Sequence, residues 1–401
     1  MEKTYDEINE KIKSGKAVIV TADEIIGLIK EKGLSKTAAQ VDVVTTGTFA
    51  PMCSSGAFLS FGHTSPRMKM QKVWLNGVFA YSGIAAVDAY IGATEVPDDD
   101  PLNKNYPGEF CYGGGHVIHD LAARKPVMLK ALGYGTDCYP RQNIETKITL
   151  DEINEAVLFN PRNAYQNYNC AVNLSDRTVY TYMGMLKPHM ENANFSTSGQ
   201  LSPLFKDPYF KSIGVGTKIF FGGGVGYIAW NGTQHSPSVQ SMDDTDKNKM
   251  FISGGTLALI GDLKQMDPKW LIGVSILGYG ASLAVGVGIP IAILNEESAY
   301  YAALKDEDLY APVVDYGIEY PIRGGNILCY VSYADLKSGT IKVEGKEVRT
   351  APVSSTPKAE EIAKTLKNWI SERGFTLTKP VKMLASPEEH VKLNFLNEKG
   401  I

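Results

Sequence analysis

Apolar residues recur at helical spacing in residues 22–33, with the sequence "ADEIIGLIKEKG". Its isoleucines and leucine fall on one face of a helix, and the closing glycine stops that helix. Helix starts are also marked by threonine followed three residues later by glutamate, because the two side chains can satisfy free N–H groups in a capping box. Three such pairs predict three helix starts: Thr4–Glu7, Thr21–Glu24 and Thr149–Glu152.

Other segments carry strand patterns. Residues 41–49, "VDVVTTGTF", are β-branched and close on a turn, which predicts a strand. Residues 271–294 form a run of 24 uncharged residues, long enough to span a bilayer as one helix. Five glycines and a proline interrupt this run, and two glutamates follow it, so we expect a strand–turn–helix buried in an α/β core instead. Residues 119–132, "HDLAARKPVMLKAL", are interpreted as helical.

The C-terminal part of the chain has its own pattern. Residues 340–355 predict a hairpin that turns near Glu344 and Gly345. A helix follows, with Thr356 as its cap, Pro357 in its first turn and Gly374 as its stop. We therefore expect an α/β (or α+β) protein, with a glycine-rich, mixed-sheet main domain over residues 1–334. Residues 335–401 form a small C-terminal α/β appendage of the same unit.

Composition and charge exclude some partners. The chain has 401 residues, of which 44% are hydrophobic and 21% charged, as in a globular protein. A net charge of -4 gives no electrostatic basis for binding a phosphate backbone, so we expect no nucleic-acid partner. The N-terminus is charged and has no apolar signal region, which favours a cytoplasmic protein without membrane contact.

The cysteines bear on redox chemistry and metals. There are five of them, the nearest two are 27 residues apart, and no CxxC pair exists. Structural zinc sites and iron–sulfur clusters normally take cysteines in close pairs, so we expect no metal site and no tightly bound cofactor in this chain. The cysteines are then either inert core thiols or isolated reactive ones.

Two of these cysteines lie in segments typical of reactive loops. Cys53 follows a predicted strand within a loop rich in proline, serine and glycine. Cys138, in "GYGTDCYPR", precedes Tyr139–Pro140, which prevents a helix there. A neighbouring Arg141 favours a thiolate at Cys138 and the adjacent Asp137 opposes it, so the sequence leaves the balance open. Cys111, next to a run of three glycines, is as typical of a core thiol as of a pocket thiol, whereas Cys170 and Cys329 are more typical of inert buried thiols.

Glycine runs and histidines supply further candidates. In "CYGGGHVIHDL", the N–H groups of Gly113, Gly114 and Gly115 could cradle an anion. This run is a poor dinucleotide fingerprint, so a dinucleotide-dependent oxidoreductase ranks lowest among the functions considered. His116 and His119 share one face of a helix that starts after the glycines. His116 could act as a general acid, although a hydrogen-bonded structural histidine is the commoner case.

Arginine on a rigid, proline-containing loop suits bidentate binding of a carboxylate. Three segments have this pattern, "SPR", "YPR" and "NPR", and surface salt bridging is the ordinary explanation for any one of them. We select Arg141 and Arg67 as the residues that bind a substrate carboxylate. Arg162 belongs to the third segment.

Three blocks of the sequence, "APMCSSGAFLSFGHTSPRMKMQKVWLNGVFAY", "GGGHVIHDLAARKPVMLKALGYGTDCYPR" and "TVYTYMGMLKP", resemble the homocysteine biosynthesis family, typified by the L-aspartate semialdehyde sulfurtransferase of methanogenic archaea. The resemblance extends over about residues 1 to 380. Many archaeal members carry C-terminal CBS domains, which we do not expect in this chain. The resemblance implies conversion of aspartate semialdehyde and reduced sulfur (sulfide or persulfide) to homocysteine, on the route to methionine in anaerobic metabolism.

The resemblance also implies roles for the two loop cysteines. Cys138 matches the family's persulfide-forming sulfur carrier, and Cys53 matches its second cysteine, for which the resemblance implies the role of resolving thiol. External electrons would come from a ferredoxin-like iron–sulfur partner, and we expect a homo-oligomer. Two alternatives stay open: sulfur insertion into a different aldehyde, because family resemblance fixes the thiols better than the pocket, and a non-catalytic sulfur-carrier or scaffold subunit for the iron–sulfur partner.

Overall fold

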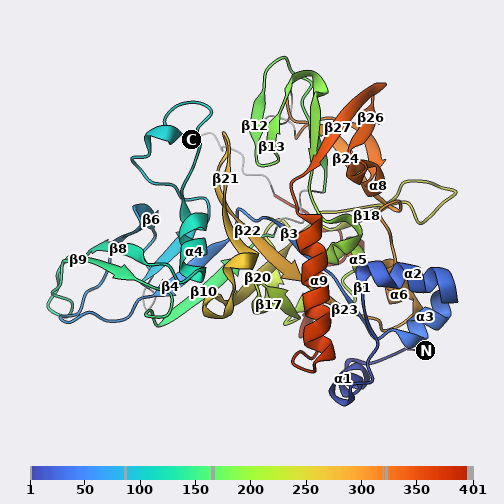
Figure 1. The fold of residues 1–401 in the computed structure, drawn as a ribbon, viewed down its shortest axis with the longest axis horizontal. Coiled ribbons are helices and arrows are strands. Elements are labelled where there is room, and N and C mark those ends of the chain that lie inside the picture. Colours follow the sequence, from blue (N-terminus) through green and yellow to red (C-terminus); the bar gives the residue numbers. More distant parts are fainter. Residues whose placement is uncertain (1, 85–87, 164–167, 319, 321–323, 395–401) are drawn as a thin grey trace.

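The computed structural model describes residues 2–84, 88–163, 168–318, 320 and 324–394, and confirms a mixed α/β fold. Two large sheets stand side by side, and a small four-stranded sheet extends from one end (Figure 1). Among the described residues the first sheet has nine antiparallel strands, with β3 paired to β22 off the main path. In spatial order they are β21 (Leu271–Ile276), β22 (Gly280–Gly288), β16 (Lys218–Phe221), β17 (Gly224–Asn231), β20 (Leu257–Asp262), β10 (Glu155–Asn160), β4 (Gly56–Ser60) and β7 (Ala89–Gly92), with β3 at Thr48–Pro51.

The second large sheet is mixed, and eight of its strands lie in the described part of the chain. Its central pairs β11–β24 and β14–β27 are parallel, whereas β11 and β14 run antiparallel to each other. In order they are β18 (Ser238–Ser241), β19 (Met250–Ser253), β24 (Leu309–Asp315), β11 (Cys170–Val172), β14 (Asn192–Phe195), β27 (Lys346–Pro352) and β26 (Thr340–Val343), with β25 (Ile327–Ser332) beside β24.

Smaller sheets complete the strand arrangement. The four-stranded sheet has the order β6 (Val78–Ala80), β5 (Lys72–Leu75), β8 (Val127–Leu132) and β9 (Asn143–Ile148). A three-stranded sheet joins β1 (Ile19–Thr21), β2 (Val43–Thr45) and β23 (Pro290–Ala292). Two pairs remain, β12 (Val179–Thr181) with β13 (Gly184–Leu186), and β15 (Gly214–Val215) with β28 (Lys382–Met383).

Two of the three expected capping boxes begin helices. Thr4 and Thr21 each accept a hydrogen bond from the backbone N–H three residues on, at the starts of α1 (Tyr5–Ser14) and α2 (Ala22–Lys32). The third prediction is wrong: Thr149 and Glu152 form the same kind of local bonds but lie in a turn between β9 and β10. A capping box satisfies the free backbone N–H groups of a single turn only. Here the residues on both sides of that turn pair in strands β9 and β10, so no helix follows. The helices that follow are α3 (Leu34–Gln40), α4 (Gly114–Ala122), α5 (Pro203–Lys206), α6 (Glu296–Ala302), α8 (Tyr333–Lys337) and α9 (Thr356–Ser371).

The helix expected over residues 119–132 is right only at its start and wrong for the rest of the segment. Helix α4 ends at Ala122, residues 123–126 turn, and residues 127–132 form β8, which pairs with β5 and β9. Arg124 has a φ of 59°, and Pro126 disfavours helical backbone in the residue before it. These two breaks release the chain to continue as a strand.

The long uncharged run enters the core as strands. Residues 271–288 form the β21–β22 hairpin, which turns through Gly278 at a φ of 71°, and β23 and α6 follow. The expected strand and the helix after it are present, but a hairpin precedes them. Within the described ranges, no helix has the length and apolar character that a membrane crossing requires.

The C-terminal hairpin and helix are confirmed as elements. Strands β26 and β27 turn through Glu344 and Gly345, and α9 follows, although Ser355 rather than Thr356 caps it. β27 pairs with β14 inside the second large sheet, and α9 packs against β22 and β3 of the first. Residues 395–401 of this segment lie outside the described part of the chain.

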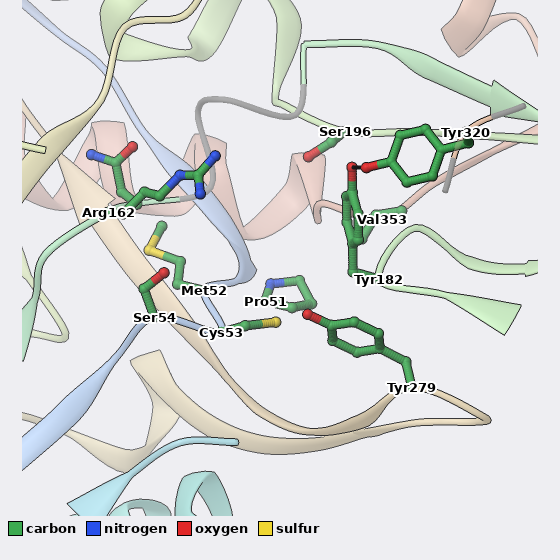
Figure 2. A pocket seen from close by; sticks show the side chains of 11 residues that line it. Pro51, Met52, Cys53, Ser54, Arg162, Tyr182, Ser196, Tyr279, Tyr320 and Val353 are labelled. Atoms are coloured by element: carbon green, nitrogen blue, oxygen red, sulfur yellow. Dashed lines mark hydrogen bonds between the residues drawn. The ribbon is translucent and has the colours of Figure 1, made fainter. Parts of the chain in front are cut away.

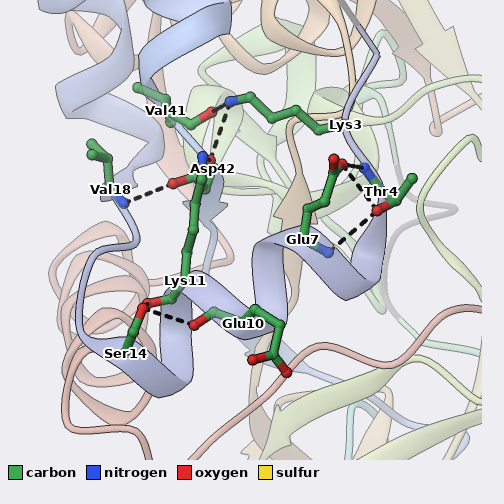
Figure 3. A network of polar contacts seen from close by, with 9 residues as sticks. All are labelled: Lys3, Thr4, Glu7, Glu10, Lys11, Ser14, Val18, Val41 and Asp42. Atoms are coloured by element: carbon green, nitrogen blue, oxygen red, sulfur yellow. Dashed lines mark hydrogen bonds and ion pairs between the residues drawn. The ribbon is translucent and has the colours of Figure 1, made fainter.

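The N-terminal helix is fixed by a buried carboxylate. Asp42 is 1% exposed and accepts a 2.7 Å bond from Lys11 and a 3.0 Å bond from the backbone N–H of Val18 (Figure 3). Lys3 approaches the same carboxylate at 3.2 Å. A buried carboxylate is costly in free energy without partners. These contacts therefore hold α1 against the start of β2, and β3 and the loop of Cys53 follow β2 in the chain.

Candidate active site

A cavity of about 280 Å³ lies where loops of the two large sheets meet (Figure 2). The first sheet supplies the loop after β3 and the segment after β10, and the second supplies residues that follow β14, β24 and β27. Because loops at sheet ends carry most catalytic groups, this cavity is the candidate active site. Its lining residues are Pro51, Met52, Cys53, Ser54, Arg162, Asn163, Tyr182, Ser196, Tyr279, Tyr320 and Val353.

Cys53 occupies the tip of a tight turn between β3 and β4. The backbone N–H of Ser55 donates to the carbonyl of Met52 at 3.0 Å, which closes the turn around Cys53. Met52 in turn donates to the carbonyl of Leu283 in β22 at 2.8 Å, continuing the pairing of β3 with that strand. The turn therefore holds the thiol at a fixed place over the β21–β22 hairpin.

Two hydroxyl groups of that hairpin donate to the Cys53 sulfur. Ser282 Oγ lies 3.1 Å from Cys53 Sγ, and the Tyr279 hydroxyl forms a second hydrogen bond to it. Burial raises the pKa of the Cys53 thiol, and the two hydroxyl donors partly offset that rise because they stabilise the thiolate. The thiol is protonated in the resting protein but lies between two groups that stabilise its anion.

This arrangement predicts a measurable pH dependence. Since burial raises the Cys53 pKa, its alkylation rate should keep increasing above the pH at which an ordinary thiol has ionised. Tyr279→Phe removes a donor that lowers this pKa, so the midpoint of the labelling rate should move to higher pH. The measurement is the rate of iodoacetamide labelling at Cys53 against pH, read by peptide mass spectrometry. Tyr182→Phe, at a pocket tyrosine that donates elsewhere, is the control; equal midpoints in Tyr279→Phe and wild type would contradict the assignment.

Asn160 connects the cysteine turn to the opposite wall. It is fully buried at the end of β10, where its side-chain amide donates to Ser55 Oγ at 3.0 Å. Its side-chain oxygen accepts from the backbone N–H of Arg162 at 2.9 Å. One side chain therefore sets the position of the cysteine turn relative to the arginine.

Arg162 brings a positive charge into the cavity. Its guanidinium points into the pocket above Met52, on the side away from Tyr279 (Figure 2). Burial lowers the pKa of this guanidinium, and its Nε atom is buried without a hydrogen-bond partner within the described ranges. A partly buried guanidinium whose buried Nε atom lacks an acceptor among the described residues is suited to an anionic ligand.

Three tyrosines join their hydroxyl groups at another wall of the cavity. The Tyr182 hydroxyl lies 2.9 Å from that of Tyr316 and 2.5 Å from that of Tyr320. Asn169 donates to the Tyr316 hydroxyl at 2.7 Å. Burial raises the pKa of Tyr182 and Tyr316 far above the neutral range, so both hydroxyl groups keep their protons.

Cys138 lies elsewhere, exposed on the loop between β8 and β9 of the four-stranded sheet. The backbone N–H of Arg141 donates to the carbonyl of Arg67 at 3.2 Å, so both predicted arginines are on this surface. None of the three lines the cavity around Cys53. The structure thus separates the two cysteines that the sequence singled out, and the roles of Cys138, Arg67 and Arg141 stay predictions.

The three consecutive glycines are packed against strands. The N–H groups of Gly114 and Gly115 donate to the carbonyls of Glu95 and Ala93 at 2.8 and 2.9 Å. A Cβ atom at these two glycines would lie 1.8 and 2.0 Å from backbone oxygens, so only glycine fits. Gly113 is equally confined, and none of the three lines the cavity. Close packing of α4 explains these glycines, and their predicted part in substrate binding stays a prediction.

The two histidines of α4 face β21, as their spacing predicts. His119 Nδ1 lies 2.6 Å from the carbonyl oxygen of Leu271, and His116 Nε2 lies 3.4 Å from Ser275 Oγ. His116 also stacks on Tyr112, with ring centroids 5.4 Å apart. It does not line the cavity, so its predicted catalytic part stays untested.

The remaining three cysteines do not line the cavity. Cys170 is buried in β11 and Cys329 is partly buried in β25, whereas Cys111 is exposed beside Glu109. In the ranges that the structure describes, no three His, Cys, Asp or Glu side chains gather as metal ligands would.

Several pocket residues were not predicted from the sequence. Tyr279 lines the cavity and Ser282 only contacts the Cys53 sulfur; both belong to the uncharged run, from which the sequence predicts nothing but core. Arg162 lines the cavity too, and the sequence does not select it. The only sequence signal for Arg162 was the segment "NPR", which "SPR" and "YPR" matched equally.

Comparison with known proteins places the chain in a family. The model of the homocysteine biosynthesis enzyme family, described as sulfur-incorporation, matches residues 17–377. The L-aspartate semialdehyde sulfurtransferase of Methanosarcina acetivorans is 47% identical over 385 residues, covering 96% of this chain and 72% of the relative. The enzyme of the same name from Methanocaldococcus jannaschii is also 47% identical, covering 96% and 74%.

A more distant relative, an uncharacterized protein of Methanothermobacter thermautotrophicus, is 26% identical over 85% of this chain and 73% of its own. No solved structure matches. From the family match over most of its length and the two close relatives, the chain belongs to the homocysteine biosynthesis enzyme family and is a sulfurtransferase of the sulfur-incorporating type.

Proposed function

We propose that this enzyme converts L-aspartate semialdehyde and reduced sulfur to L-homocysteine in the cavity around Cys53. The observation that carries the proposal is a cavity-lining thiol with two hydroxyl donors, in a chain 47% identical to enzymes named for this substrate. A cavity of about 280 Å³ is of the size that a four-carbon amino-acid aldehyde needs.

Electron balance requires a reductant. Replacing the aldehyde oxygen by sulfur from hydrogen sulfide releases water and gives a thioaldehyde, and two electrons with two protons then give the thiol. If sulfur arrives instead as a cysteine persulfide, at the oxidation level of elemental sulfur, four electrons are needed in all. A ferredoxin-like iron–sulfur protein is the proposed source, with no tightly bound cofactor in this chain.

The two cysteines divide the chemistry. The terminal sulfur of a Cys138 persulfide attacks the aldehyde carbon, giving a disulfide between Cys138 and a hydroxyalkyl sulfur. The Cys53 thiolate then attacks the Cys138 sulfur, so the substrate-bearing sulfur leaves as a thiohemiacetal and a Cys53–Cys138 disulfide forms. Loss of water gives the thioaldehyde, whose reduction yields homocysteine, and two further electrons reopen the disulfide.

This path requires the loop after β8 to move during turnover, because Cys138 does not line the cavity. Exposure of that loop supports its part in the path, since an exposed thiol can accept sulfur from a donor in solution. The loop, rather than the buried turn at Cys53, is then the element that travels between donor and substrate.

The test is turnover by the purified chain. L-aspartate semialdehyde, polysulfide and a chemical reductant are supplied without oxygen, and homocysteine is measured by mass spectrometry. We expect homocysteine to accumulate beyond one equivalent per chain. None should form when the reductant is omitted, because the thioaldehyde then stays unreduced. Formation only when an iron–sulfur partner is added would favour the carrier-subunit alternative, and no formation under either condition would refute the proposal.

A further inference from the structure

One end of the cavity has the composition of a carboxylate site. The Arg162 guanidinium and the hydroxyl groups of Ser196, Tyr182 and Tyr320 are on one side in Figure 2, and Cys53 and Tyr279 are on the other. Among the described residues, Arg162 is the only charged side chain that lines this cavity, and no aspartate or glutamate lines it.

Counting protons on the tyrosines adds a second donor. Three hydroxyl groups carry three protons, and two of these protons are used in the two contacts of Tyr182 with its neighbours. Tyr316 already accepts from Asn169, so it can donate to Tyr182, which then donates to Tyr320. In that order the Tyr320 proton is left to donate into the cavity, at the end of a chain of aligned hydrogen bonds.

Resting on the proposed function, we propose that Arg162, with the Tyr320 hydroxyl, binds the carboxylate of the substrate and thereby directs its aldehyde towards Cys53. Guanidinium binds carboxylate through two parallel N–H bonds, and a neutral phenol adds a third donor. The described lining residues include no carboxylate that could pair with the ammonium group of the substrate. The substrate class is therefore a short aldehyde with a carboxylate at its other end, and the amino group contributes less to binding.

The first test does not depend on turnover. Iodoacetate and iodoacetamide differ by a carboxylate, so a guanidinium in the cavity should speed labelling of Cys53 by iodoacetate relative to iodoacetamide. We expect Arg162→Gln to lower the ratio of the two rates at Cys53 by about tenfold, and Arg162→Lys to restore part of it. Cys138 in the same molecule is the internal control, because its ratio should not change.

A second variant guards against a general loss of positive charge or of folding. Arg141→Gln, at the surface loop, should leave the ratio at Cys53 unchanged, and thermal unfolding of each variant checks the fold. An unchanged ratio in a folded Arg162→Gln protein, or an equal fall at Cys53 in Arg141→Gln, would overturn the inference.

The second test separates this inference from the proposed function. We expect 4-oxobutanoate, which lacks only the amino group, to slow labelling of Cys53 by iodoacetamide at concentrations within about tenfold of those of aspartate semialdehyde. We expect 3-aminopropanal, which lacks only the carboxylate, to give no protection up to about a hundred times that concentration. Protection by carboxylates without any homocysteine formation would refute the proposed function alone; equal protection by the two analogues would refute the carboxylate site alone.

Discussion

Cys53→Ser should lower homocysteine formation about 1000-fold or more, while Cys138 of the variant still takes up one sulfur atom from polysulfide. Serine keeps the shape of the side chain but is a far weaker nucleophile at neutral pH, so the disulfide exchange that releases the substrate sulfur cannot occur. The two measurements are kcat/KM for homocysteine formation and the mass of the Cys138 peptide after polysulfide treatment.

The matched control is Cys329→Ser, at a partly buried cysteine in β25 that does not line the cavity. It should retain wild-type turnover. Normal turnover by a folded Cys53→Ser enzyme would show that Cys53 is a structural residue. The same result would contradict the assignment of this cavity as the active site.

Cys138→Ser should reduce homocysteine formation to background and abolish sulfur uptake from polysulfide, because the exposed loop thiol is the proposed entry point for sulfur. Iodoacetamide labelling of Cys53 should be unchanged, since Cys138 does not line its cavity. This separates loss of the sulfur carrier from damage to the substrate site.

Cys111→Ser is the control here, because Cys111 is the other exposed cysteine of the described chain. Its activity and sulfur uptake should equal those of the wild type. A fully active Cys138→Ser enzyme would rule out sulfur transfer from Cys138 to the substrate. Mild oxidation of the wild type tests the same path, because transfer between the two cysteines predicts a Cys53–Cys138 disulfide as its product.

The sequence determined the features that depend on neighbouring residues. The capping boxes of α1 and α2, the hairpin at Glu344 and Gly345 and the helix after it each depend on contacts within a few positions, and they formed as predicted. The same local reasoning placed Cys53 in a loop after a strand. It failed where a strand partner outweighed the local preference, as in β8 and in the turn at Thr149.

Only the tertiary structure decided which groups surround the thiol. Ser282 is 229 residues from Cys53 in the sequence, and the pairing of β3 with β22 brings them together. Pairing of β10 with β4, reinforced by Asn160, puts Arg162 into the cavity, while Arg67 and Arg141 end on the surface beside Cys138. Three arginines with the same local sequence pattern therefore differ in location, because strand register, set by contacts distant along the chain, determines which of them faces the cavity.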